Sequence, residues 1–464
     1  MKPAIVIPSY WASGVKLGTP GGVQCYDHAI PIDEEKPSLD ACLASLEQVL
    51  GLKEATVIIL VVAPTTVEER AVHRVKDIVD KYPWLPRVVI VDSFKAMVIN
   101  SILAPELPAD IGEPISLRGY GAIRNIGLIC CCATGCDAAI FLDDDEVVLD
   151  EDFLANAVYG FGQVDRSGMP IMAKSGYFLD RRNSALADRR NVKFYDRYWA
   201  KRAGFNEWMT QALAGPRISR SPYLCGGCHA LHAGAFTRVA FDPWITRGED
   251  EDYLINLRFY GIDVWFDNRW RVRHLPPRQT DTAARFLQDV YRWTYERRKI
   301  EVCNSNIDLQ KVSPSDLMPY PGPWISPELP GRARKTAFWR SIMTPEHADY
   351  RKIFNGGLKA AEAYAEENCM RYLSLQSCWR SVTTLAWLNG EIENILEGDG
   401  MLNASVASRM AARPANVGLA DVSAPGAGAP GDGAARGGDG EAAGLDGKTD
   451  GHGIPINRGG VMPH

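Results

Sequence analysis

The stretch "AAIFLDDDEVV", residues 138–148, decides the fold of this chain. Five mostly apolar residues run directly into four consecutive carboxylates, Asp143, Asp144, Asp145 and Glu146. The apolar run predicts a buried strand. Carboxylates packed this closely repel one another, so at least one of them usually has a raised pKa. We therefore expect a positively charged group beside the end of this strand.

The N-terminal part of the chain alternates between strand and helix patterns. Ser38 is expected to cap the first helix and Gly51 to end it. Continuous apolar strands that alternate with helices predict an α/β fold, with a mostly parallel central sheet and helices on both faces. Ligands of such sheets bind at the carboxyl ends of the strands, which is where the acidic cluster lies. The expected strands are 4–10, 55–64, 87–94 and 138–145, and the expected helices are 38–51, 66–82 and 120–136.

The remaining patterns divide the chain into three parts. Residues 11–37 form a long connection that should overhang the same edge of the sheet. Farther on, 250–261 is typical of a helix that ends at Gly261, and 263–275 of strands. Helical patterns dominate 278–396, and residues 401–464 contain no Phe, Trp or Tyr. We expect an α/β domain over 1–277, an α-helical C-terminal region over 278–398 and a disordered Gly/Ala-rich tail over 399–464.

The composition excludes several classes of protein. The net charge of −6 and the pI near 5.8 give no basic field for nucleic acid. The most apolar run is residues 55–64, whereas a membrane helix needs about 20 residues, so no transmembrane segment is expected. The 11 cysteines are odd in number, and a chain of this length needs no disulfide bonds to fold. With no signal-peptide pattern, we expect a cytoplasmic protein.

Three interpretations of the acidic cluster compete. The first is a solvated turn after a strand. The second is a site for Mg²⁺ or Mn²⁺, because alternate residues of an extended segment, Asp143 and Asp145, point in related directions and can share one ion. The third is a pair of carboxylates for acid/base chemistry, as in glycoside hydrolysis. Such pairs normally come from separate segments, and the position at the ligand edge argues against the first.

The order of the motifs resembles glycosyltransferases of the GT-A fold, especially family 2. The motifs are "IPSY" in the first strand, "IRNIGL" in a helix, "IFLDDDE", "GEDEDYLINLRFYG" and a histidine after a later strand. The resemblance covers roughly residues 3–277. The helical C-terminal region is similar in architecture to that of glucosyl-phosphoglycerate and mannosylglycerate synthases. The resemblance implies a metal-dependent transferase that moves a sugar from a UDP- or GDP-sugar to a hydroxyl acceptor.

The resemblance also implies a role for individual residues of the donor site. Asp145 would bind Mn²⁺ or Mg²⁺ directly, Asp143 would act through water or sugar hydroxyls, and His274 in "RVRHLPP" would complete the metal site. Relatives often end the second strand in carboxylates, whereas this chain has "VVAPTT" there, which leaves the nucleotide open. The expected donor-binding residues are Pro8, Tyr10, Arg124, Asn125 and Asp144.

A second acidic run, Glu249 to Asp252, precedes a helix. Acidic residues favour a helix N-terminus through its dipole, and capping is the structural explanation. The resemblance implies instead an acceptor site, in which Asp250 deprotonates the acceptor hydroxyl of an inverting enzyme and Glu249 holds the acceptor. It adds Gly226, Gly227 and Asp252 to the acceptor site.

Other functions stay open at this stage. They are a retaining transferase of the synthase type named above, a sugar nucleotidyltransferase that would use the Gly-rich segment with Lys16, and a catalytically dead nucleotide- or sugar-binding protein.

The segment "CGGCHALH" fits the haem c pattern at Cys225, Cys228 and His229, or a zinc site with His232. We favour ordinary loop packing there.

One helix raises the possibility of peripheral membrane contact. Residues 281–299 combine arginines and lysine with four aromatic side chains, Phe286, Tyr291, Trp293 and Tyr295. Such a helix can lie on a membrane surface, although a solvated face over an ordinary core is favoured.

Overall fold

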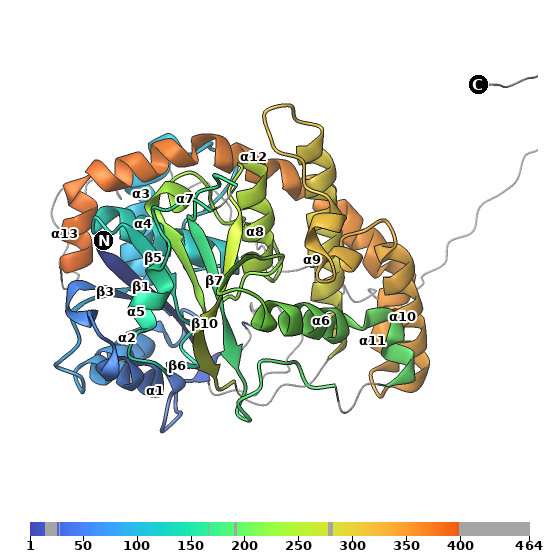
Figure 1. The fold of residues 1–464 in the computed structure, drawn as a ribbon, viewed down its shortest axis with the longest axis horizontal. Helices are drawn as coiled ribbons and strands as arrows, with labels where there is room; N and C mark the ends of the chain where they lie inside the picture. Colours follow the sequence, from blue (N-terminus) through green and yellow to red (C-terminus); the bar gives the residue numbers. More distant parts are fainter. Residues whose placement is uncertain (14–25, 27, 166, 190–192, 277–281, 399–464) are drawn as a thin grey trace, which may run out of the picture. The chain divides into compact units, whose positions relative to one another are not determined.

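The computed structural model describes residues 1–13, 26, 28–165, 167–189, 193–276 and 282–398 (Figure 1). The predicted tail therefore lies outside the described residues. Ten strands form one sheet in the order β4-β3-β1-β5-β9-β7-β10-β6, with β2 beside β1 and β8 beside β10. The strands are β1 Pro3–Ala12, β2 Ile30–Pro31, β3 Thr56–Val62, β4 Arg87–Val91, β5 Ala138–Phe141, β6 Glu146–Val148, β7 Ala173–Leu179, β8 Ile218–Arg220, β9 His229–His232 and β10 Val264–His274.

The strand directions bring distant segments to one edge. β4, β3, β1 and β5 are parallel, β9 runs against β5 and β7, and β10 is parallel to β7. The carboxyl ends of β1, β5 and β10 therefore share one edge of the sheet. This confirms the predicted α/β fold with a mostly parallel sheet, and it places the acidic cluster and His274 at the same edge.

Helices surround the sheet, and every residue of β3 is buried, as expected for a strand covered on both faces. α4 packs closely on the sheet, because Gly127 lies against the side chains of Val6 and Leu60. The α-helices are α1 Ser38–Ser45, α2 Glu68–Val79, α3 Ser93–Leu103, α4 Tyr120–Ala133, α5 Phe153–Val158, α6 Lys201–Ala214, α7 Ala233–Phe236, α8 Glu249–Phe259, α9 Ala283–Asn304, α10 Leu329–Met343, α11 His347–Lys352, α12 Leu358–Leu388 and α13 Gly390–Glu397.

Two local predictions were wrong. α1 begins at Ser38 itself with Pro37 as the residue before it, so Ser38 is not the cap, and the helix changes to a 3₁₀ turn at Leu46. The strand predicted over 87–94 ends at Val91. Asp92 then accepts a hydrogen bond from the backbone N–H of Lys95 at 2.8 Å and starts α3, which the apolar run had hidden.

The C-terminal helices hold the segment that leads into α8. Trp379 of α12 donates to the carbonyl of Phe236 at 2.9 Å, and Gln376 accepts from the backbone of Ala240 at 2.9 Å. Lys299 of α9 is 1 % exposed and bridges the carboxylates of Asp242 and Asp252. The predicted division at residues 277 and 398 stays a prediction.

The aromatic side chains of the helix now identified as α9 favour the expected core packing over the membrane-surface alternative. Phe286, Tyr291, Trp293 and Tyr295 are all buried, and Lys299 is paired inside the protein. The aromatic side chains pack into the core, so they cannot face lipid. In the part of the chain that the structure describes, no helix has the length and apolar character to cross a membrane.

We expect Lys299→Met to destabilise the protein strongly. The change leaves Asp242 and Asp252 buried without their cation, and breaking such a pair costs about 3–5 kcal/mol. Urea unfolding followed by tryptophan fluorescence measures the free energy of unfolding. The control, Lys359→Met on an exposed turn of α12, should change it by less than about 0.5 kcal/mol. Equal effects of the two changes would contradict the buried bridge.

Candidate metal and carboxylate site

The structure gives each carboxylate of the 143–146 cluster a different partner. Arg124 donates to Asp143 at 3.0 Å, and the backbone N–H of Tyr10 donates to Asp144 at 3.1 Å. Two histidines contact Asp145, and Glu146 packs against Gly227. Separate partners resolve much of the like-charge repulsion predicted from the sequence. Burial remains the main influence on two members and raises the pKa of Asp144 and of Glu146.

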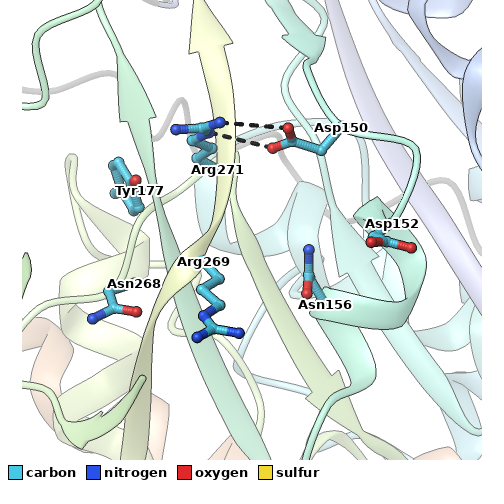
Figure 2. A pocket seen from close by; sticks show the side chains of 7 residues that line it. All are labelled: Asp150, Asp152, Asn156, Tyr177, Asn268, Arg269 and Arg271. Carbon is cyan, nitrogen blue, oxygen red and sulfur yellow. Dashed lines mark hydrogen bonds and ion pairs between the residues drawn. The ribbon is translucent and has the colours of Figure 1, made fainter. Parts of the chain in front are cut away.

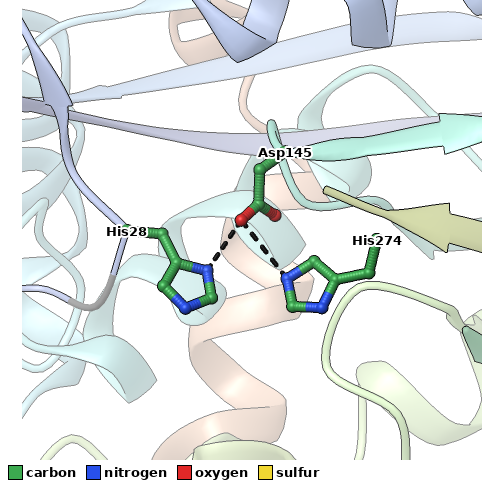
Figure 3. Close-up of side chains that lie close together, drawn as sticks. All are labelled: His28, Asp145 and His274. Carbon is green, nitrogen blue, oxygen red and sulfur yellow. Dashed lines mark hydrogen bonds and ion pairs between the residues drawn. The ribbon is translucent and has the colours of Figure 1, made fainter. Parts of the chain in front are cut away.

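Asp145 lies between two imidazole rings (Figure 3). Its Oδ2 is 2.7 Å from Nδ1 of His28 and 3.2 Å from Nε2 of His274. Burial alone would raise the pKa of Asp145, but hydrogen bonds and charge from His274 and His28 outweigh it and hold this pKa well below its usual range. Asp145 is therefore a carboxylate at neutral pH.

Backbone pairing places the three side chains. His274 ends β10 opposite Glu146 of β6, and the next residue, Leu275, donates its N–H to the carbonyl of Asp145 at 2.8 Å. His28 precedes β2, which pairs with the end of β1. The backbone of His28 has φ of 69°, a left-handed conformation that is uncommon outside glycine and concentrates at functional sites.

The donor set fits a divalent transition-metal ion. One ligand atom from each of His28, Asp145 and His274 lies within 4.8 Å of the other two, and among the described residues this is the one group of its kind. The side chains of His28 and His274 are 19 % and 20 % exposed, so one side of the group is open. Imidazole nitrogen with carboxylate oxygen suits Mn²⁺ better than Mg²⁺, which prefers oxygen alone.

Arg124 joins the two acidic runs of the sequence. It lies on α4, is 4 % exposed, and donates both to Asp143 at 3.0 Å and to Glu249 at 3.1 Å. Burial disfavours its charge, but the charges of Asp143 and Glu249 outweigh that effect and raise the pKa of Arg124. Arg124 is thus the positive group that the sequence predicted, although it holds protein carboxylates.

The four acidic residues at the start of α8 have different surroundings. Glu251 pairs with Arg292 of α9 and accepts from the hydroxyl of Tyr320 at 2.9 Å. Asp252 is fully buried between Lys299 and Asn256, so its carboxylate bonds other residues of the protein, and its acceptor role stays a prediction. Glu249 and Asp250 remain beside Arg124 and Gly226. Burial, with the charge of Glu251, raises the pKa of Asp250 to about 6, and burial raises that of Glu249 to about 7.

The predicted acceptor glycines serve close packing between carboxylates. A Cβ built on Gly227 would lie 2.1 Å from Oε2 of Glu146, and one built on Gly226 would lie 3.1 Å from Oδ2 of Asp250. Gly248, the residue before α8, has φ of 68°, and a Cβ there would overlap the guanidinium of Arg292. The backbone of 226–227 therefore lies between the 143–146 cluster and the start of α8.

The predicted donor residues separate into two groups. The side-chain amide of Asn125 bonds backbone groups. It donates to the carbonyls of Pro114, at 3.1 Å, and of Phe241, and it accepts from the backbone N–H of Phe241. Pro8 is buried within β1. Tyr10 instead packs with two further rings, Tyr26 and Tyr120, at centroid distances of 4.8 and 6.0 Å.

Sequence reasoning missed His28, Tyr26 and Tyr120. All three lie close to residues it did identify, and two of them come from the long connection 11–37 that was expected at this edge. The sequence offered one signal for Tyr26 and His28, the expected position of that segment at the ligand edge of the sheet. No spacing pattern within the segment marks a ligand. Lys16 and the rest of 14–25 lie outside the described residues.

The "CGGCH" segment is a buried loop. His229 stacks on Phe141 and its Nδ1 is 2.9 Å from the carbonyl of Cys225. Burial, helped by Arg124, lowers the pKa of His229 to about 3, so its ring is neutral. Cys225 and Cys228 are buried thiols, and in the described chain they join no group of metal-ligand geometry. His232 instead accepts from the backbone of Gly234. These contacts favour loop packing, as expected.

A separate polar hollow of about 290 Å³ lies beside β10 (Figure 2). Arg271 pairs with Asp150 across it at 3.3 Å. Two carboxylates and two guanidinium groups line it together with neutral side chains, so its charges balance and select no class of ligand. The lining residues are Asp150, Asp152, Asn156, Tyr177, Asn268, Arg269 and Arg271.

Comparison with known proteins finds similarity at the level of fold. No family model and no curated protein matches the sequence. A mannosyltransferase from Pyrobaculum calidifontis, solved with GDP-Man and Mn²⁺, covers 83 % of this chain and 87 % of its own at 12 % identity, with a TM-score of 0.39. The glucosyl-3-phosphoglycerate synthase of Mycobacterium tuberculosis, solved with Mn²⁺ and UDP-Glc, covers 65 % of this chain and 78 % of its own at 14 % identity, with a TM-score of 0.31.

A third solved structure, GalNAc-T7 with UDP, GalNAc and Mn²⁺, covers 66 % of this chain and 51 % of its own. Its identity is 13 % and its TM-score 0.34. The function proposed below rests on the residues of this chain.

We expect the wild-type protein to bind one Mn²⁺, and Asp145→Asn, His28→Ala and His274→Ala each to weaken that binding by at least about tenfold. Each change removes one donor of the set. Electron paramagnetic resonance of free Mn²⁺ measures the affinity. His73→Ala, which removes an exposed histidine on α2, is the control and should leave the affinity unchanged. Unaltered binding in all three site variants would place the ion elsewhere.

Proposed function

We propose that this protein is a metal-dependent glycosyltransferase that moves a sugar from a UDP- or GDP-sugar to a hydroxyl acceptor. The observation that carries the proposal is that a set of metal ligands and a set of acid/base side chains are connected at one edge of the sheet. One set, His28, Asp145 and His274, has the donor chemistry for Mn²⁺. The other, Glu249 and Asp250, has the raised pKa values of acid/base groups and connects to the first run of carboxylates through Arg124.

The metal group supports a nucleotide diphosphate as the donor. A divalent ion held by His28, Asp145 and His274 would supply positive charge to a departing diphosphate, an effect worth several kcal/mol. The open side of the group leaves room for phosphate oxygens. Tyr10, Tyr26 and Tyr120 form an aromatic cluster at the end of β1, in which Tyr26 and Tyr120 are partly exposed, and we assign the nucleoside to it because bases stack on aromatic rings.

Asp250 is our choice of general base. As the acceptor oxygen forms its bond to the sugar C1 and the C1–phosphate oxygen bond breaks, the hydroxyl proton passes to a carboxylate oxygen of Asp250. Glu249 accepts a hydrogen bond from Arg124, and we assign to it the role of accepting a hydrogen bond from the acceptor. Arg124 acts as a positioning residue, because it fixes Glu249 relative to Asp143. A base on the acceptor side favours inversion of the sugar configuration, and a retaining reaction would not need it.

The donor class is tested by thermal shift with UDP, GDP, CDP and ADP, each with and without Mn²⁺. A ligand at 100 times its dissociation constant stabilises by about 2.7 kcal/mol. We expect UDP or GDP to stabilise the wild type in the presence of Mn²⁺, and Asp145→Asn to lose the effect. Sugar transfer is then assayed with the matching donor. Release of pyrophosphate would show the nucleotidyltransferase alternative, and nucleotide binding without donor turnover the catalytically dead one.

We expect Asp250→Asn to lower kcat by roughly 10²–10⁴-fold while the nucleotide-dependent thermal shift is kept. The amide keeps the shape of the carboxylate but cannot take the proton. Glu69→Gln, in the exposed first turn of α2, is the matched control and should retain full activity. An Asp250→Asn enzyme with wild-type kcat would exclude Asp250 as base and favour the retaining alternative.

The pH profile gives an independent check on the same residue. The base must be ionised to accept a proton, and burial raises the pKa of Asp250 to about 6. The kcat/KM should therefore be constant above that pH and fall about tenfold for each unit below it. Steady-state rates between pH 5 and 8, corrected for stability at each pH, measure the profile. A limb that is unchanged in Asp250→Asn would assign the titration to another group.

A further inference from the structure

An unusual concentration of exposed apolar side chains lies on α10 and its neighbours. All three exposed phenylalanines of the described chain are there, Phe194, Phe338 and Phe354, with exposed fractions of 63 %, 43 % and 38 %. The ring of Phe338 is 5.7 Å from that of Phe354. Single exposed apolar residues need no explanation, whereas a gathered group marks an interaction surface. We call Phe194, Phe338, Ile342, Met343 and Phe354 the α10 patch.

The exposed side of α10 is amphipathic along its length. Ala333, Thr336 and Ala337 are buried on the inner side. Arg334, Lys335, Phe338 and Ile342 are exposed, and their spacing of three or four residues puts them on one face. Cations occupy the N-terminal half of this face and apolar side chains the C-terminal half. Figure 1 shows α10 and α11 beyond α6, away from the strands.

A basic hollow of about 530 Å³ borders the patch. Tyr198 lies between two cations, with the guanidinium of Arg197 4.7 Å and the ammonium of Lys335 5.3 Å from its ring centroid. Arg332 also lines the hollow, and its neighbour Glu328 is its ion-pair partner at 2.9 Å. Positive charge is therefore in excess here, in a chain whose net charge is −6.

We propose that the α10 patch docks on an anionic phospholipid surface, with the aromatic and aliphatic side chains entering the interface and Arg197, Arg332 and Lys335 contacting phosphate groups. Apolar side chains beside cations on one helix face are the features that bind helices to anionic membranes. A second copy of the chain is a poorer occupant, because a two-fold interface at this patch would bring the cations of both copies together. Docking is independent of whether the chain transfers a sugar.

The test is co-sedimentation of the full chain with vesicles of phosphatidylcholine alone and of phosphatidylcholine with phosphatidylglycerol. We expect binding to the anionic vesicles, weaker binding to the neutral ones, and loss of binding at high salt. Phe338→Ser with Ile342→Ser, and separately Arg197→Glu with Lys335→Glu, should each weaken binding at least about tenfold. Leu388→Ser, which removes a side chain that is 77 % exposed on α12, is the matched control.

We expect the variants to fold, because every changed side chain is exposed, and their unfolding midpoints check this. No binding of the wild type to anionic vesicles would overturn the proposal, as would equal binding by the Phe338→Ser, Ile342→Ser variant. If the wild type instead sediments as a dimer that this variant converts to a monomer, the patch is an interface between copies and the membrane proposal fails. Sugar transfer is assayed separately and without membranes, so failure of one proposal can be distinguished from failure of the other.

Discussion

The structure depends on one buried cation, the guanidinium of Arg124. It is 4 % exposed and donates to carboxylates from two segments that are far apart in the chain, Asp143 and Glu249. A buried carboxylate without a partner is costly, and so is a buried guanidinium, so each of these groups needs the others. Because Arg124 lies on α4, this bridge fixes the end of β5 and the start of α8 relative to one helix.

Ion pairs between buried cations and carboxylates also hold the first turn of α8. Arg292 pairs with Glu251, and Lys299 pairs with Asp252, and both cations come from α9. The C-terminal helices therefore neutralise the acidic run that α4 cannot reach. Among the described residues Asp250 makes no ion pair, and its one hydrogen bond runs from the neighbouring N–H of Glu251 at 2.9 Å. The packing that stabilises this turn leaves one carboxylate without a cation.

The sequence was sufficient for β1, β3, β5 and β10, for the start of β4 and for the sheet edge, because apolar runs and strand–helix alternation are local signals. It gave no strand at β7, β8 or β9. The resemblance to GT-A glycosyltransferases assigned Asp145 and His274 to one site, and the structure brings their side chains together. The sequence could not find His28, whose approach depends on pairing between β2 and β1. The resemblance assigned both Asp250 and Asp252 to an acceptor site, and sequence alone could not show that Asp252 pairs with Lys299 of α9. The amide of Asn125 bonds the backbone of Phe241, which is distant in sequence and so could not be identified as its partner from the sequence.

Most of the acidic groups at this edge are satisfied by contacts whose geometry also explains the glycines around them. Gly227 makes room for Glu146, Gly248 for Arg292, and both would clash with any larger residue. These contacts leave Asp145 between two partly exposed imidazoles, and they leave Asp250 with a raised pKa and no ion pair among the described residues. Local departures from complete pairing are costly and persist where function requires them. Asp250 is such a departure, and it follows Glu249, the residue that the Arg124 bridge connects to Asp143 in the acidic cluster of Asp145.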